Sequence, residues 1–127
     1  MSNENSYSIE LNLAADPHLA RLVRMSAANV AMLSSMSVER VEDIKMAAEE
    51  AFIFACAASA GSELSVAFAA DSEGVAMDFS LKGSTFEAPQ DGDATAAYAD
   101  LILASVCDAY EKSDDASGLH LELGADV

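Results

Sequence analysis

The sequence predicts a single α+β domain over residues 1–127, a two-layer sandwich with three helices on one face of a mixed, largely antiparallel sheet. Three observations lead to this prediction. A long stretch near the middle has helical spacing, two alternating apolar–polar stretches flank a turn after it, and a further alternating stretch lies near each end of the chain. The expected order of elements is β-α-α-β-β-α-β.

The first strand and the first helix are expected within the first 35 residues. Tyr7–Leu13 alternates between apolar and polar side chains, which predicts a strand with one buried face. Asp16 and Pro17 are the residue types preferred at the N-cap and first position of a helix. We expect the inner stripe of this helix to contain Leu19, Leu22, Val23, Val30 and Leu33. Three methionines on another sector suit an adaptable partner surface or a core, and we favour the core: Met25, Met32 and Met36.

The central helix is expected at Val38–Ala60, after a break at Ser34 and Ser35. Ser37 is its expected N-cap, because its hydroxyl can accept a hydrogen bond from an exposed amide of the first turn. From Ala51 to Ala58 this stretch is apolar all round, so we expect neighbours to cover that end on more than one side.

A β-hairpin follows. Leu64–Phe68 and Val75–Leu81 both alternate, and the turn residues of Asp71–Gly74 lie between them. Gly83–Asp93 has the composition of a loop, and Ala94–Glu111 is expected to form the third helix. The last strand is expected at Leu119, Leu121 and Leu123.

Charge and composition exclude several classes of function. The chain has 22 acidic residues and 6 basic ones, a net charge of −16, which disfavours nucleic acids and anionic membrane surfaces and favours a basic protein partner. The alternative is that the charge only maintains solubility. The chain has no apolar run of about 20 residues and no signal-peptide pattern, so a cytoplasmic location is expected.

Isolated reactive side chains give little indication of a site. Cys56 and Cys107 lack metal-ligand spacing, and we expect two buried free thiols. His18 and His120 are expected to be surface residues, and no catalytic pairing with either cysteine has motif support.

Two runs carry a resemblance to a known family: IELNLAADPHLARLVR at residues 9–24 and VEDIKMAAEEAFIFA at residues 41–55. They resemble the anti-sigma-factor serine/threonine kinases of bacteria, the switch-protein branch of the histidine-kinase-like ATPases with the Bergerat fold. The match covers most of the chain. The resemblance implies a Bergerat-like sandwich that holds ATP and magnesium, forms a homodimer, and binds a sigma factor or an anti-anti-sigma protein.

The nucleotide motifs of that family are degenerate in this chain. The resemblance places Glu50 at the position of the catalytic base and Phe54 where an Asn would bind magnesium. A phenyl ring has no lone pair for a hard cation, which requires oxygen ligands. Glu50 is therefore interpreted as a vestigial base, and the alternative is an ordinary exposed glutamate.

Two further motifs are altered. The family's Asp-x-Gly-x-Gly, in which the Asp accepts from adenine, corresponds to Leu81, Gly83 and Thr85, and only Gly83 is retained. The phosphate-cradling Gly-x-Gly corresponds to Ala97 and Ala99, so both glycines are absent. No metal site and no cofactor are expected.

The sequence thus favours a degenerate relative of the anti-sigma kinases that acts by protein–protein binding in bacterial transcription or stress regulation. Whether it is an enzyme stays open, with the negative answer favoured. The alternative is an active ATP-dependent protein serine/threonine kinase with unconventional nucleotide ligands and Glu50 as its base. A third possibility is a structural module without a ligand.

Overall fold

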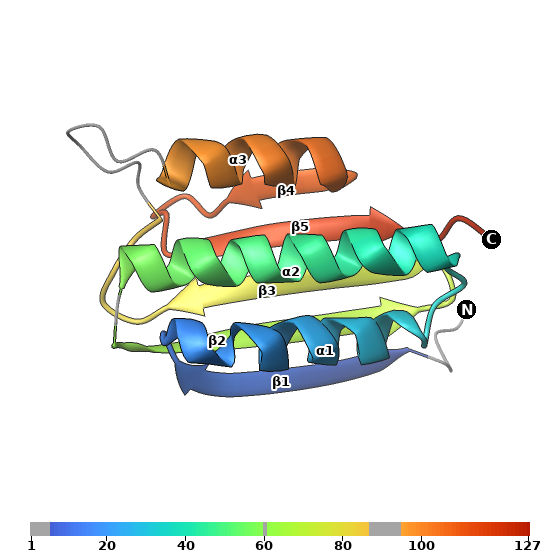
Figure 1. Cartoon of the computed structure of the whole chain (residues 1–127), viewed down its shortest axis with the longest axis horizontal. Helices are drawn as coiled ribbons and strands as arrows, with labels where there is room; N and C mark the ends of the chain where they lie inside the picture. The colour runs from blue at the N-terminus through green and yellow to red at the C-terminus, as the bar shows by residue number, and fades with distance from the viewer. Residues whose placement is uncertain (1–5, 60, 87–94) are drawn as a thin grey trace.

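The computed structural model describes residues 6–59, 61–86 and 95–127. The described elements are, in chain order, β1 (Tyr7–Ala14), the 3-10 helix η1 (Pro17–Leu19), α1 (Ala20–Ala31), α2 (Val38–Ala58), β2 (Glu63–Asp71), β3 (Gly74–Leu81), α3 (Thr95–Val106), β4 (Ala109–Lys112) and β5 (Gly118–Gly124). Figure 1 shows α1, α2 and α3 side by side in front of the strands. The coarse α+β prediction is therefore confirmed.

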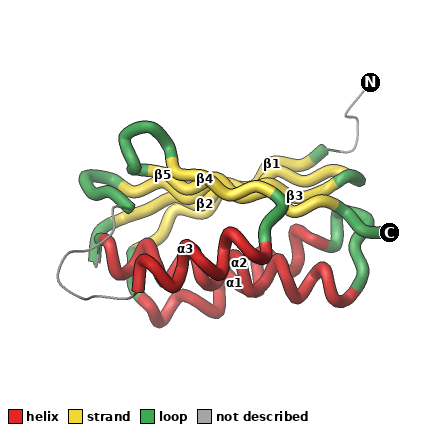
Figure 2. The backbone as a smooth tube through the Cα atoms, turned by 90° about the horizontal axis from the view of Figure 1, so that it is seen from above, coloured by secondary structure: helices red, strands yellow, loops and turns green. Residues whose placement is uncertain are grey.

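The strands form one sheet in the order β1-β2-β3-β5-β4, and each neighbouring pair is antiparallel. The expected sheet was mixed, whereas every pairing between described strands is antiparallel. Figure 2 shows the helices on one side of this sheet, and no described helix lies on the other. The uncovered face carries small and charged side chains, among them Ala67, Asp78, His120 and Glu122.

The expectation that the third helix continues to Glu111 is wrong. The helix ends at Val106, and Ala109–Lys112 forms the edge strand β4, in which Tyr110 is opposite Leu121 of β5. The chain turns at Asp108, whose carboxylate accepts from the backbone N–H of Gly124 at 2.6 Å. These contacts with distant residues decide the structure here. The residue at which the helix was expected to start, number 94, lies outside the described residues.

Helix α2 lies between α1 and α3 and packs in front of β3 (Figure 1). Its buried side chains include Ile44, Phe52 and Phe54. The expected cover on several sides is confirmed for most of its apolar end, although Ile53 and Ala57 are exposed on the outward side. The expected N-cap is also present, because the hydroxyl of Ser37 accepts from the N–H of Arg40 at 3.1 Å.

The expected inner stripe of α1 is only partly correct. Val23 and Val30 are buried together with two alanines, whereas Leu22 and Leu33 are exposed. Each residue turns a helix by about 100°, so an arc centred on Val23, Ala27 and Val30 leaves Leu22 outside it, and Leu33 lies beyond the end of α1. The core interpretation of the methionines is wrong for two of them: Met25 and Met32 are exposed, while Met36 is partly buried.

The edge strand and the helix start also differ from the expectation in detail. Ile9 is exposed and Leu11 and Leu13 are half-buried, because β1 pairs on one side only. Asp16 caps a helix as expected, by accepting from the N–H of His18 at 3.0 Å, but the first turn is the 3-10 helix η1.

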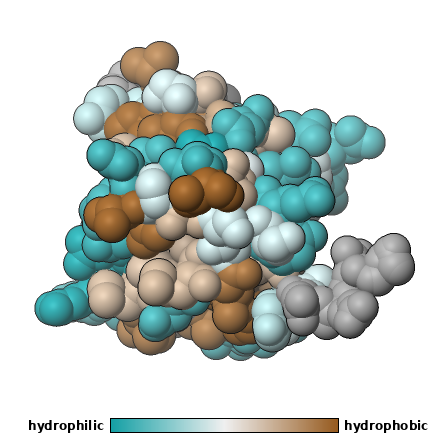
Figure 3. All heavy atoms as spheres, turned by 90° about the vertical axis from the view of Figure 1, so that its right-hand side faces the viewer, coloured by the Kyte–Doolittle hydropathy of each residue, from teal (hydrophilic) through white to brown (hydrophobic). Residues whose placement is uncertain are grey.

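At one end of the molecule, apolar and polar groups are interspersed on the surface. Figure 3 looks onto the right-hand end of Figure 1 and shows brown, hydrophobic residues scattered among teal, hydrophilic ones. Val38, which begins α2, and the C-terminal Val127 are among the exposed apolar residues. Among the described helices, none combines the length and the apolar character that crossing a bilayer requires. Cys56 and Cys107 are free and buried, as expected.

Candidate functional site

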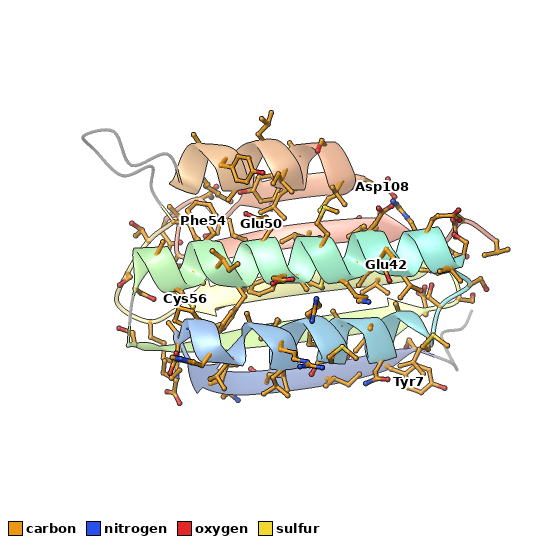
Figure 4. The ribbon with its side chains drawn as sticks, in the orientation of Figure 1. Tyr7, Glu42, Glu50, Phe54, Cys56 and Asp108 are labelled. Carbon is orange, nitrogen blue, oxygen red and sulfur yellow. The ribbon has the colours of Figure 1, made fainter. Side chains whose placement is uncertain are left out.

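The residues at the family's metal and base positions lie one turn apart on α2. Figure 4 shows Glu50 and Phe54 on the side of α2 that faces α3. Phe54 is 2% exposed, and its ring meets that of Phe86 at a centroid distance of 5.0 Å and an interplanar angle of 75°. Offset and edge-to-face ring pairs of this kind stabilise a core beyond the area that they bury. The position that a magnesium ligand would require is therefore part of a packed aromatic pair.

Phe86 is held in place by the connection between β4 and β5. Its backbone N–H donates to the carbonyl of Ala116 at 2.6 Å, and the N–H of Leu81 donates to the carbonyl of Ser117 at 2.8 Å. Leu81 and Phe86 are both buried. The segment after β3 is thus fixed at both ends against the same turn, with its apolar side chains in the core.

A polar cluster of Asp100, Tyr110 and Lys112 lies next to the aromatic pair, on the side of β4. The ammonium of Lys112 lies 5.5 Å from the centroid of the Phe54 ring, within the range of a cation–π interaction, and 3.3 Å from Oδ2 of Asp100 on α3. The Tyr110 hydroxyl donates to Oδ1 of the same Asp100 at 2.5 Å. Burial, and then the hydrogen bond to Asp100, raise the pKa of Tyr110 far above its usual range.

This cluster engages the cation that lies over the ring of Phe54. Lys112 already pairs with Asp100 and covers Phe54, so its charge is balanced within the protein. A nucleotide phosphate at this place would have to compete with that carboxylate for the ammonium. Through Asp100, Tyr110 and Lys112, the cluster connects α3 and β4 to the aromatic pair.

Glu50, unlike Lys112, has no partner for its charge among the residues that the structure describes. Its half-buried carboxylate has no hydrogen bond or ion pair within the described ranges, whereas Glu49 lies 3.9 Å from Arg24. Burial, and then the neighbouring charge of Glu49, raise the pKa of Glu50. Glu50 also lines a hollow of about 240 Å³ formed by α2 and by Arg24 of α1, together with Glu42, Lys45, Met46 and Glu49.

The remaining motif positions are divided between core and surface. Leu81 and Ala99 belong to the same hydrophobic core as Phe54. Gly83, Thr85 and Ala97 are exposed, and Gly83 has a φ of 79°, in the region that favours glycine. Three of the four apolar replacements, Phe54, Leu81 and Ala99, therefore belong to the core, whereas Ala97 lies on the surface.

These residues do not fit ATP and magnesium by the family's mode of binding. Phe54 offers no oxygen to a cation, Leu81 offers no acceptor to adenine, and both side chains are buried in apolar packing. Nowhere in the described part of the chain do three or more His, Cys, Asp or Glu side chains form a group that could hold a metal ion.

Two larger hollows lie elsewhere. One of about 460 Å³ borders the β2–β3 turn and includes Tyr7 and Asp108, and the other, of about 450 Å³, lies beside His120 and the β4–β5 turn. His120 lies on the open face of the sheet, as expected, and is half-buried there: its Nδ1 is 2.7 Å from Asp78 and its Nε2 is 2.7 Å from Glu122. Hydrogen bonds to Glu122 and then Asp78 raise the pKa of His120. Each nitrogen of the ring therefore has a partner on the open face of the sheet.

Sequence reasoning did not find the groups that surround Phe54. Asp100, Tyr110 and Lys112 meet only because β4 pairs with β5, and β4 was expected to be helical. Ala109–Lys112 has no apolar–polar alternation and spans only four residues, so no local signal was available for this strand.

Comparisons with known proteins do not identify a family. The chain matches no model of a known protein family, and the search of curated proteins finds no relative of significant similarity.

Proposed function

We propose that this protein is a regulatory protein that acts by binding another protein and not by nucleotide chemistry, as a degenerate relative of the anti-sigma-factor kinases. The family part of this proposal rests on the sequence resemblance. Its expected role is in bacterial transcription or stress regulation, with a sigma factor or an anti-anti-sigma protein as partner and a homodimer as the assembly.

The observation that carries the proposal is the edge-to-face pair of Phe54 and Phe86. An enzyme of this type would need an oxygen ligand where Phe54 is packed and an acceptor where Leu81 is buried. Rebuilding a nucleotide site would require the removal of large side chains from the core, which is strongly destabilising. A protein-binding role requires only that the fold present its surface.

The test is capture of the named partner classes with and without nucleotide. Immobilised protein is incubated with purified sigma factors and anti-anti-sigma proteins from the source cell, in the presence of ATP and magnesium or of a chelator. The proposal expects at least one of them to bind equally under both conditions. Phosphate transfer from ATP to an anti-anti-sigma protein would contradict it and support the active kinase. Failure of every candidate to bind would contradict the partner assignment.

A further inference from the structure

Two neighbouring helices, α2 and α3, carry exposed apolar residues and one half-buried acid, which are together called the α2–α3 patch here: Met46, Glu50, Ile53, Tyr98 and Leu101. Tyr98 and Leu101 are 61% and 69% exposed, and Met46 and Ile53 are 48% and 37% exposed. α2 and α3 lie next to each other in Figure 1, and Figure 4 shows Glu50 on the α3 side of α2. Clustered apolar side chains with polar neighbours are typical of protein-binding surfaces.

Helix α3 has little free charge. Its only charged residue is Asp100, whose partly exposed carboxylate is engaged by Tyr110 and Lys112. Large side chains such as Tyr98 and Leu101 therefore face solvent without neighbouring charges on their own helix. Aromatic and aliphatic anchors of this kind are common at the centre of interfaces.

Glu50 supplies the charge at this patch. Met46, Glu50 and Ile53 follow one another at intervals of four and three residues, so they share the outward side of α2. Glu50 has no cationic partner within the described ranges, although Glu42 pairs with Lys45 and Glu49 lies near Arg24. A half-buried carboxylate without a cation weakens the fold of the free protein, and a cation from outside would relieve this.

Charge also distinguishes between possible occupants. A second copy of this chain docked on this patch would bring another carboxylate, its own Glu50, and no added cation, so the homodimer proposed above is expected to form through another face. A basic segment would be attracted both by the whole protein and by Glu50 itself.

We propose that the α2–α3 patch is the docking surface for an amphipathic helix of another protein, with apolar residues that pack on Leu101, Tyr98 and Ile53 and a lysine or arginine that pairs with Glu50. The proposal rests on the protein-binding function proposed above and names the surface and the chemistry of the partner. Proteins repeatedly recognise the apolar face of an amphipathic helix with an apolar surface of their own.

The test uses a synthetic amphipathic peptide of leucine and lysine, with a leucine–glutamate peptide of the same length as its counterpart. Backbone amide shifts of the isotope-labelled full chain are followed by NMR, and affinity is followed by calorimetry at low and high salt. We expect the basic peptide alone to bind, to weaken at high salt, and to shift amides around Glu50 and Leu101.

Three variants separate specific docking from general attraction to an acidic protein. Glu50→Gln and Leu101→Ser are each expected to raise the dissociation constant about tenfold. This loss lies between the small loss expected for an exposed interface group and the large loss expected for a buried one. Glu10→Gln removes an equal charge from exposed β1 and is expected to change binding less than about twofold.

No binding, equal weakening by Glu10→Gln, or shifts confined to the open face of the sheet would overturn the proposal. Self-association of the chain through this patch would also overturn it. Binding elsewhere leaves the protein-binding function in place, whereas ATP-dependent phosphate transfer overturns that function whatever the peptide does.

Discussion

The ring of Phe54 meets the ring of Phe86 edge to face, with centroids 5.0 Å apart, and the ammonium of Lys112 lies 5.5 Å from the centroid of Phe54. One residue comes from the central helix, one from the segment after β3 and one from the edge strand β4. The place at which the family resemblance would put a metal ligand is therefore a junction of three parts of the core.

Phe54→Ala should destabilise the protein by about 3–5 kcal/mol, because it removes a fully buried ring and leaves Phe86 without its partner. Phe54→Asn should be at least as destabilising, since the amide also needs hydrogen-bond partners in the core. The measurement is chemical denaturation followed by circular dichroism. Ile53→Ala, on the exposed side of the same helix, is the control and should cost less than about 1 kcal/mol. Equal effects would show that Phe54 is not packed as described.

Lys112→Met should destabilise the protein by about 1 kcal/mol, because the cation–π contact and the pair with Asp100 are both lost. Both members of that pair are partly exposed, so solvent screening keeps the effect small. Lys82→Met is the matched control: Lys82 pairs with Glu63 in an exposed position, and no measurable change is expected. The measurement is the denaturation midpoint of each variant. Equal midpoints for Lys112→Met and Lys82→Met would contradict the stabilising role given to Lys112.

Glu50→Gln should raise the melting temperature at pH 7 or leave it unchanged. Burial and Glu49 raise the pKa of Glu50 in the folded protein, so its contribution to stability is present at low pH and is lost as the pH rises through the folded pKa. The difference from the wild type should disappear below about pH 4, where the carboxyl is protonated in both states. A variant that is less stable at pH 7, while Glu10→Gln is neutral, would indicate a partner of Glu50 within the fold.

Asp108→Asn should show the opposite pH dependence. The N–H of Gly124, and then Arg40, hold the pKa of Asp108 below its usual value, so its contribution is present above the unfolded pKa and is lost as the pH falls. The variant should therefore melt at a lower temperature than the wild type at pH 7 and approach it below about pH 4. Asp114→Asn, in the exposed turn between β4 and β5, should match the wild type throughout. A deficit for Asp108→Asn that persists at low pH would contradict this electrostatic explanation.

Much of the fold could be predicted from the sequence because its main signals are local. The alternation in β2 and β3 is a periodic pattern that burial imposes directly, and the uniformly apolar second half of α2 requires neighbours on several sides. The strand at Ala109–Lys112 was missed because neither Gly nor Pro separates it from α3, and only its pairing with β5 makes it a strand. Tertiary contacts also decide which residues of α1 are buried, so Leu22 faces solvent although the helix has apolar residues on several sides.

The candidate site was predictable in part. The burial of Phe54 follows from the apolar run around it, and its position relative to Glu50 follows from helix geometry. Its contact with Phe86 could not be predicted. Phe86 is positioned by the hydrogen bond from its backbone N–H to the carbonyl of Ala116, and these two residues are far apart in the chain. The position of Lys112 depends on the register between β4 and β5, which no local pattern in the sequence specifies.

The central claim is that nucleotide does not bind, and thermal unfolding of the wild-type protein with and without ATP and magnesium tests it most directly. A ligand at 100 times its dissociation constant stabilises a protein by about 2.7 kcal/mol, which in a domain of this size raises the melting temperature by several degrees. We predict no change with ATP and magnesium over the chelator control. A magnesium-dependent rise of several degrees would contradict the claim and restore the active kinase, with Glu50 as its base.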